Sequence, residues 1–254
     1  MSPPRPLVAL ARSPRPTDIA GVITRLHAIE EALPPEHGVV AFNRLYRWTT
    51  ENIDRAVTTG RFEEPAEMAA LDVRFADLYF DAVDAWATGA EIPGAWAPLL
   101  ERGDDPDVSS LRFALAGMHA HINRDLSVAV AISSACEPTE PTPQFRDYAL
   151  VNTVLDETSD EVRHQFLPSL VRRVDEALGE LDDRAIIGLI GVARRAAWEA
   201  AQILYPLREH PRRWRLALAG LDTAVGMSAR ALLLDPELPR VASWRWSLVD
   251  PHDE

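Results

Sequence analysis

Apolar residues recur at helical spacing in nearly every segment of this chain, between stops made by proline and glycine. Residues 19–33 are the first example. Their apolar positions follow i, i+3, i+4 spacing from Ile19 to Leu33, and Pro34 and Pro35 end the pattern. Such spacing is typical of an amphipathic α-helix, whereas a half-buried strand alternates apolar and polar residues. No alternating stretch of convincing length occurs, so we predict an all-α fold.

The helix boundaries follow from these stops. Thr17 or Asp18 supplies the first N-cap, Gly60 ends the second pattern, and Pro65 opens the third at a first-turn position. The predicted helices cover about 19–33, 39–59, 65–89, 95–100, 107–135, 144–157, 160–178, 182–206 and 212–233. Their connections are short, which favours a single-domain multi-helix bundle.

The domain organisation is predicted from the same pattern. Residues 1–16 are rich in proline and arginine and are expected to form a flexible arm, followed by one helical domain over 17–254. The proline-rich stretch 137–143 is the only candidate for an internal linker. The segment 107–135 is apolar nearly all round, so it is predicted to be the buried central helix of the bundle.

Charge and composition exclude several function classes. The 39 acidic residues outnumber the 26 basic ones, which gives a net charge of −13 and argues against a nucleic-acid partner. All the basic residues are arginine, so a pyridoxal-phosphate lysine and a nucleotide P-loop are excluded. The single cysteine, Cys136, excludes an iron–sulfur cluster. No secretory segment or membrane span is evident, and we expect a cytoplasmic protein.

Polar residues concentrate in one stretch of the predicted central helix. At 100° per residue, His121 and Asp125 fall together on one flank of its apolar stripe. Arg112, His119 and Asn123 fall together on the other flank. Buried polar groups cost free energy unless they have partners, so both clusters indicate a site or a specific hydrogen-bond network.

An acidic stripe of Asp77, Asp81 and Asp84 follows the predicted helix 65–89. Like charges on one stripe repel each other unless they meet cations, a metal or water. One interpretation is that Asp77 and Asp81 face His121 and Asp125 across a helix interface. These four side chains would then suit a divalent zinc, iron or manganese ion. The other interpretation is a solvated stripe.

Two roles for the central cluster stay open beside the metal site. Beside a metal held by His121 and the aspartates, His119 with Asn123 and Arg112 would orient the substrate or act as acid or base. In a metal-free enzyme the same carboxylates and histidines, His121 and Asp125 among them, perform general acid–base chemistry directly. Alternatively, the cluster is a hydrogen-bond network that fixes helix register. The remaining histidines, at positions 27, 37, 210 and 252, are expected to be solvated, and Glu161 and His164 form a single Glu-x-x-His.

Aromatic side chains at helical spacing are expected to wall a substrate cavity. The predicted pocket residues are four aromatic side chains and one arginine, and they are Tyr46, Arg74, Tyr79, Trp86 and Trp198. Trp48 and Phe75 are further candidates for the apolar wall. Such apolar cavities with a few polar groups are typical of small-molecule sites.

Three segments resemble those of a family of uncharacterised actinobacterial proteins, catalogued as a domain of unknown function. They are Phe42-Asn43-Arg44-Leu45-Tyr46, the stretch LDVRFADLYFDA from Leu71 to Ala82, and AGMHAHINRDL from Ala116 to Leu126. The resemblance covers most of the chain. It implies an all-helical intracellular protein, sometimes encoded near pathways of secondary metabolism. It implies no reaction.

A looser likeness is to zinc-dependent phospholipase C and P1-type nucleases. These helical proteins use His-x-x-x-Asp pairs, and the segment from His121 to Asp125 matches one such pair. The chain departs from that pattern because it has too few well-spaced histidines and no secretion signal. A three-zinc site is therefore not expected.

Two functions are consistent with these features. The first is a small-molecule enzyme of natural-product biosynthesis, a cyclase, lyase or hydrolase whose site lies between helices 65–88 and 107–135. The second is a non-catalytic ligand-binding or complex-forming partner protein whose buried His/Asp cluster is structural. An oligomer is compatible with either function.

Overall fold

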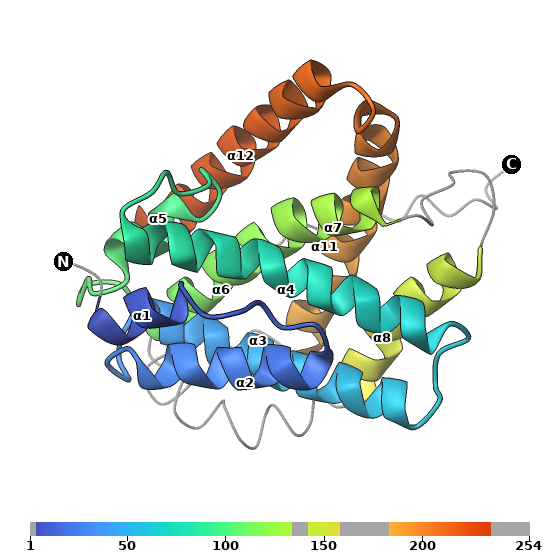
Figure 1. Ribbon diagram of the computed structural model, residues 1–254, viewed down its shortest axis with the longest axis horizontal. Helices are drawn as coiled ribbons and strands as arrows, with labels where there is room; N and C mark the ends of the chain where they lie inside the picture. The colour runs from blue at the N-terminus through green and yellow to red at the C-terminus, as the bar shows by residue number, and fades with distance from the viewer. Residues whose placement is uncertain (1–3, 134–141, 158–182, 235–254) are drawn as a thin grey trace, which may run out of the picture.

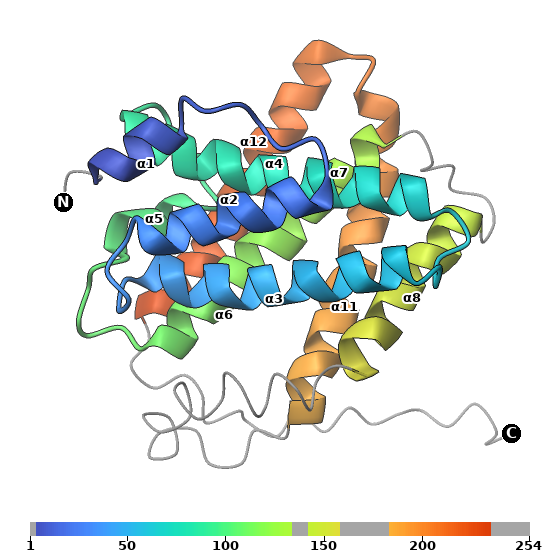
Figure 2. The same ribbon diagram turned by 60° about the horizontal axis from the view of Figure 1, so that its bottom comes forward.

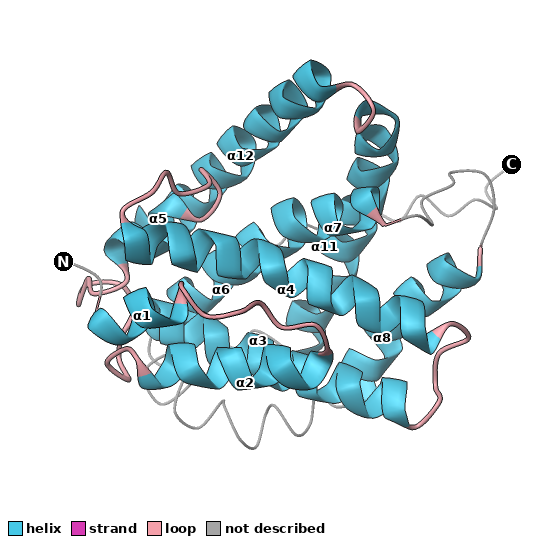
Figure 3. Cartoon of the chain, in the orientation of Figure 1, coloured by secondary structure: helices cyan, strands magenta, loops and turns pink. Residues whose placement is uncertain are grey.

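The computed structural model describes residues 4–133, 142–157 and 183–234, with the side chains of residues 183–189 left out. In this part of the chain, helices joined by loops are the only regular secondary structure, and there is no strand (Figure 3). The all-α prediction is confirmed. Cys136, Glu161, His164, the predicted helix 160–178 and most of the predicted linker 137–143 lie outside the described residues.

The helices follow the predicted order with end shifts of a few residues (Figure 1). They are α1 (Arg5–Leu10), α2 (Ile19–Glu31), α3 (Gly38–Thr58), α4 (Pro65–Thr88), α5 (Ala97–Arg102), α6 (Ser110–Ala120), the π-helical segment η1 (His121–Leu126), α7 (Ser127–Ile132), α8 (Pro143–Glu157), α11 (Asp183–Leu204), the 3-10 turn η2 (Tyr205–Leu207) and α12 (Pro211–Leu234).

Local sequence explains where these helices begin and end. The Asp18 carboxylate caps α2 by accepting a 2.7 Å hydrogen bond from the Gly21 amide. Gly60 and Gly89 follow α3 and α4 with φ values of 70° and 73°, the left-handed conformation that glycine adopts without strain. The start of α4 is capped from a distance, because the buried Asp147 carboxylate in α8 accepts hydrogen bonds from the amides of residues 63 and 64.

The segment predicted as the central helix runs from α6 through η1 into α7 without a break. It packs against α3, α4, α11 and α12, which surround it in the structure (Figure 2). Its burial confirms the prediction. The prediction missed the π-helical turn in its middle. Such turns widen the hydrogen-bond ladder to i→i+5 and occur frequently at functional sites.

The π-helical turn lies between two apolar cores. Upstream of it, Phe113 and Ala116 in α6 belong to the larger core, which α2, α3, α4 and α5 share. Downstream, Val128 and Val130 in α7 belong to a second core with α8 and α11. One helical stretch therefore contributes to both cores.

The N-terminal segment is not a loose arm over its described residues. Residues 5–10 form α1, and Leu7 is only 1% exposed because it packs into the larger core. Arg15 forms ion pairs with Asp81 and Asp84 of α4, at 2.6 and 2.9 Å. The prediction of a flexible arm was wrong here, since proline and arginine content does not reveal such tertiary contacts.

Helices α11 and α12 form a hairpin whose tip stands away from the other helices (Figures 1 and 2). The C-terminal half of α12 is the part that packs closely on the bundle. A Cβ added to Gly226 would lie 2.3 Å from the carbonyl oxygen of Gly94, so the two backbones approach too closely for any side chain there.

Candidate active site

His121 and Asp125 form a buried hydrogen-bonded pair in η1. The Nδ1 atom of His121 lies 3.0 Å from Oδ2 of Asp125, and the two side chains are 3% and 0% exposed. The carboxylate accepts the hydrogen bond, which fixes the proton on Nδ1 and leaves the lone pair of the neutral imidazole on Nε2. The sequence-predicted pairing of these residues on one flank is therefore present.

Further donors surround the Asp125 carboxylate. The indole Nε1 of Trp96, which precedes α5, donates to Oδ2 at 2.9 Å. The Arg124 guanidinium donates to Oδ1 at 2.9 Å and also contacts Asp222 of α12 at 3.2 Å. Both carboxylate oxygens of Asp125 are thus hydrogen-bonded, which is what a fully buried carboxylate requires. This network holds the imidazole of His121 in one orientation.

Aromatic rings enclose the imidazole of His121. Phe75 of α4 stacks on it with ring centroids 3.6 Å apart and planes 10° from parallel, and Tyr46 of α3 meets it edge-on at 4.3 Å. The other rings lie 5.6 to 6.0 Å away, and they are Phe42, Tyr79 and Trp96. We call these five rings the aromatic cage. Burial in the cage lowers the pKa of His121, although the Asp125 hydrogen bond opposes the shift, so the imidazole is neutral near pH 7.

Three buried polar atoms beside this cage lack a hydrogen-bond partner in the described part of the chain. They are Nε2 of His121, the hydroxyl oxygen of Tyr46 and Oδ2 of Asp72. Burial raises the pKa of Asp72 to about 7. Burial also raises the pKa of Tyr46 well above its usual value, and the charge of nearby Asp72 adds to that shift. His121 and Asp72 are thus both neighbours of Tyr46, whose ring meets the imidazole and whose pKa responds to the charge of Asp72.

The other predicted flank of the central helix faces α12. The Asn123 side-chain amide donates to the ring Nδ1 and the backbone carbonyl of His119, each at 3.1 Å. Arg112 donates from Nε to the carbonyl oxygen of Leu232 in α12 at 2.9 Å. These residues therefore attach the central helix to α12, and they lie apart from the aromatic cage. Burial lowers the pKa of His119.

The acidic stripe of α4 faces arginines and not the imidazole. Asp84 accepts both hydrogen bonds of a bidentate contact with Arg25 of α2, at 3.0 and 2.9 Å. Asp81 pairs with Arg15, and the α4 residue that meets His121 is Phe75. The predicted convergence of Asp77 and Asp81 on His121 and Asp125 is absent, because those positions point to the opposite side of α4.

The residues proposed as metal ligands are consequently not assembled. Among residues 4–133, 142–157 and 183–234, no three His, Cys, Asp or Glu side chains converge as a metal site would require. Arg15 and Arg25 supply the positive charge that the acidic stripe needs. Burial raises the pKa of both Asp77 and Asp81, with Arg15 opposing the shift.

A family match accounts for most of the chain. Residues 19–235 match a family of unknown function, DUF5995. The chain belongs to this family. The matched range includes the aromatic cage, the His121–Asp125 pair and every described helix except α1. No curated protein and no solved structure matches the chain, so the looser likeness to zinc-dependent phospholipases has no support.

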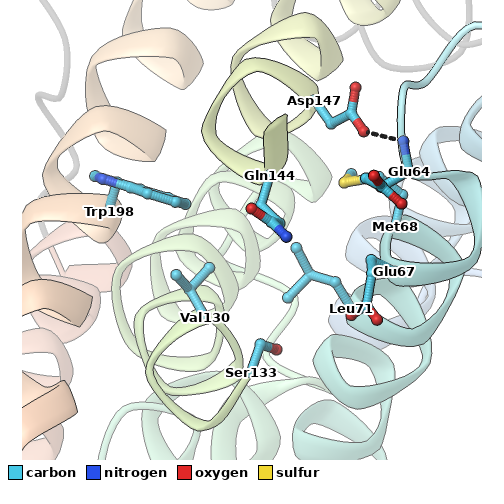
Figure 4. A pocket seen from close by; sticks show the side chains of 9 residues that line it. All are labelled: Glu64, Glu67, Met68, Leu71, Val130, Ser133, Gln144, Asp147 and Trp198. Carbon is cyan, nitrogen blue, oxygen red and sulfur yellow. Dashed lines mark hydrogen bonds between the residues drawn. The ribbon is translucent and has the colours of Figure 1, made fainter. Parts of the chain in front are cut away.

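The DUF5995 chain has a groove beside the cage, between α4, α7, α8 and α11 (Figure 4). Met68 and Leu71 of α4 line it, and they lie on the same helix face as Asp72 and Phe75, about one turn before them. Its volume of about 30 Å³ is roughly that of a single water molecule. None of the residues that line the groove belongs to the cage, and the groove does not hold a substrate-sized space.

The five predicted pocket residues of this DUF5995 protein do not share one cavity. Tyr46 and Tyr79 lie in the aromatic cage, whereas Trp198 lines the groove. Arg74 donates to the hydroxyl of Ser133 at the rim of the groove. Trp86 lines a different cavity of about 200 Å³ beside α5. The prediction of a single pocket from these residues was wrong.

The prediction that His37 is solvated was also wrong for this DUF5995 chain. His37 was expected to be solvated, but it is 3% exposed and its Nδ1 accepts a hydrogen bond from the Val39 amide at the start of α3. Its ring lies against Gly103, where a Cβ atom would come within 2.2 Å of the imidazole. The close approach of Gly103 is what makes room for the buried ring.

The sequence analysis named neither Phe42 nor Arg124 as a site residue, and it missed two more. Trp96 lies in a short segment without local polar periodicity, so nothing in its neighbourhood predicts that its indole reaches Asp125. Asp72 is the other. It shares the inner face of α4 with Leu71 and Phe75, and an acid on an otherwise apolar face is a signal that could have found it.

Proposed function

We propose that this protein is a general acid–base enzyme that acts on a small molecule without negative charge, with His121 as the base. The observation that carries the proposal is the group of buried, unpartnered polar atoms on His121, Tyr46 and Asp72. A buried polar atom without a partner costs about 1–3 kcal/mol. A substrate that forms hydrogen bonds to these three atoms would remove that cost.

His121 is suited to accept a proton through Nε2. Its Nδ1 is bonded to Asp125, and this arrangement orients the ring and stabilises the imidazolium that forms when Nε2 is protonated. Trp96 and Arg124 hold the carboxylate in place in turn. The lowered pKa of His121 keeps Nε2 unprotonated, as a base requires at neutral pH.

Asp72 is the candidate acid. A carboxyl group whose pKa is raised to about 7 is protonated in a large fraction of molecules near neutral pH, and it can return a proton to the substrate. Tyr46 keeps its proton because its pKa is raised, so its hydroxyl can donate a hydrogen bond to a substrate oxygen. A proton moved from one substrate atom to another is the chemistry of isomerases and lyases.

The surroundings favour a small substrate without negative charge. The aromatic cage presents ring faces and no counter-charge to an anion, and burial of a charge without a partner is strongly unfavourable. Phe75 covers one face of the imidazole, so entry from the side of α4 requires the ring of Phe75 to move. Side-chain rotation of this kind is fast compared with typical turnover.

A specific observation favours a second candidate, a non-catalytic partner protein. Small-molecule sites usually offer 300–1,000 Å³, whereas the groove beside the cage measures about 30 Å³. If the cage never opens, the His121–Asp125 pair serves only to fix the packing of η1 against α3 and α5. Activity would then reside in another protein.

Untargeted mass spectrometry of a metabolite extract incubated with purified protein distinguishes the two candidates. The acid–base enzyme consumes at least one small molecule. His121→Gln and Asp72→Asn abolish that conversion, while Asn123→Ala on the opposite flank retains it. Circular dichroism and thermal unfolding confirm that each variant is folded. Folded wild-type protein that converts nothing in extracts of its source organism would support the non-catalytic candidate.

A further inference from the structure

The tip of the α11–α12 hairpin exposes large apolar side chains. Ile203 at the end of α11 is 71% exposed and Leu216 in the first turns of α12 is 77% exposed. Trp214, which lies between these two residues in the sequence, is half-buried. Both views show this tip projecting from the bundle (Figures 1 and 2). Large apolar side chains exposed near one end of a hairpin are typical of an interaction surface.

The same tip is basic, although the chain as a whole carries a net charge of −13. Arg212, Arg213 and Arg215 are exposed, and Arg208 stacks over the ring of Tyr205 at 3.7 Å. Glu209 is the only acidic residue between positions 205 and 216. Within the described residues, neither Arg212 nor Arg213 forms an ion pair. The partner that complements this tip is therefore anionic.

Helix α12 is the one described helix that is long and apolar enough to cross a membrane, and only 22% of its apolar stretch is buried. Its contacts indicate a surface role for the tip and not a span. Asp222 bonds to Arg124, and Gly226 packs on Gly94, so the second half of α12 is held against the bundle. The first half packs Trp214 and Leu218 against the second core and leaves its opposite face, with Arg212 and Leu216, exposed.

We propose that this hairpin tip docks on an anionic lipid surface. Arg212, Arg213 and Arg215 contact the lipid phosphates, while Ile203 and Leu216 enter the boundary between headgroups and acyl chains. Exposed arginines together with exposed aliphatic side chains are a combination that interfacial binding uses. Attraction of basic residues to anionic lipids adds to the apolar contribution and weakens with salt.

Cosedimentation of the full chain with lipid vesicles tests this proposal. We expect binding to phosphatidylcholine vesicles that contain phosphatidylglycerol, no binding to phosphatidylcholine alone, and release at high salt. The double variant Arg212→Glu/Arg213→Glu should lower binding on the order of tenfold or more, because two attractive charges become repulsive. Leu216→Ser should lower it as well.

Two matched controls lie on the same helix, further from the tip. Arg230 and Met227 are exposed on α12, so Arg230→Glu and Met227→Ser repeat each change outside the proposed surface. Both variants should bind vesicles as the wild type does. Equal loss of binding in the control variants, or equal binding to neutral vesicles, would overturn the proposal.

A second copy of the chain is the competing occupant of this tip. Sedimentation velocity reveals it as a concentration-dependent dimer that Leu216→Ser abolishes, without vesicle binding, and that result would also overturn the proposal. The proposal does not depend on the acid–base function, because the tip variants leave His121, Asp72 and Tyr46 unchanged. A failure of one therefore does not imply a failure of the other.

Discussion

The ring of Phe75 lies flat on the imidazole of His121, with centroids 3.6 Å apart and planes within 10° of parallel. Phe75 is only half-buried, whereas His121 is almost completely enclosed. Phe75 therefore covers one face of the buried imidazole, and access to His121 from the side of α4 depends on that ring.

Replacement of Phe75 by leucine should expose His121. The smaller side chain removes the stacked ring while it keeps the site apolar, at a cost of about 1–2 kcal/mol in unfolding free energy. We expect faster carbethoxylation of His121 by diethyl pyrocarbonate, measured by mass spectrometry of the modified peptide. An unchanged rate would mean that Phe75 does not control access. Phe145→Leu, a ring change in α8 at a contact with Trp198 and not with His121, is the control.

The stability of the protein should depend on pH through Asp72. Its folded-state pKa of about 7 lies above the ordinary value of 3.8, so its stabilising contribution is complete below about pH 3.8 and is lost as pH rises toward 7. Asp72→Asn removes this dependence. Between pH 5 and pH 7 the wild type should lose on the order of 1–2 kcal/mol relative to the variant. Urea unfolding at both pH values measures the difference.

The histidine of the cage should show the opposite dependence. Burial lowers the folded-state pKa of His121, so the unfolded chain binds the proton first as pH falls through about 6.5, and stability decreases toward acidic pH. In an NMR titration the His121 resonances should stay those of the neutral ring at pH values where exposed histidines are already protonated. Co-titration of His121 with the exposed histidines would contradict a buried, neutral base.

Gly117→Ala should destabilise the cage. An added Cβ would come within 2.4 Å of the Phe42 ring, which itself packs against His121. We expect a loss of about 1–3 kcal/mol in unfolding free energy, since Phe42 cannot move without disturbing its neighbours. The matched control is Gly220→Ala in α12, where no atom lies within 4 Å of the added Cβ. That substitution should stabilise the helix by about 0.5–1 kcal/mol.

Asp147 offers a test of how α8 is attached to the bundle. Its carboxylate accepts hydrogen bonds at 2.8 Å from the amides of Glu63 and Glu64, which precede α4. Asp147→Ala should therefore cost about 1–2 kcal/mol of unfolding free energy, as the loss of an N-cap does. Asp156→Ala, an exposed carboxylate on the same helix, should change stability little. A loss for Asp147→Ala no larger than that for Asp156→Ala would contradict the role of Asp147 as a cap, because alanine has the higher helix propensity at both positions.

The sequence predicted those features that depend on local chemistry. Helical spacing located the described helices after residue 18, and the stops at Gly60 and Gly89 lie where the backbone adopts a positive φ. The i, i+4 spacing also predicted the His121–Asp125 pair and its separation from His119 and Asn123, because neighbours on one helix share a face wherever that helix packs.

Contacts between distant segments could not be predicted in the same way. The acidic stripe of α4 could meet cations or a metal equally well on charge alone, and the arginines that it meets come from positions 15 and 25. Trp96 reaches Asp125 only because the loop before α5 folds beneath η1. Periodicity shows which residues of one helix lie together, but it does not show what faces them.

The π-helical turn also changes the direction in which the side chains after it point around the axis of the central helix. Each residue of an α-helix advances by about 100°, so deleting one residue from His121–Leu126 to restore α geometry would rotate everything beyond it by about that angle. Val128 and Val130 would then leave the second core, while α6 kept its place in the first. A single extra residue thus allows one unbroken helical stretch to contribute to both apolar cores, with the buried imidazole of His121 at the junction.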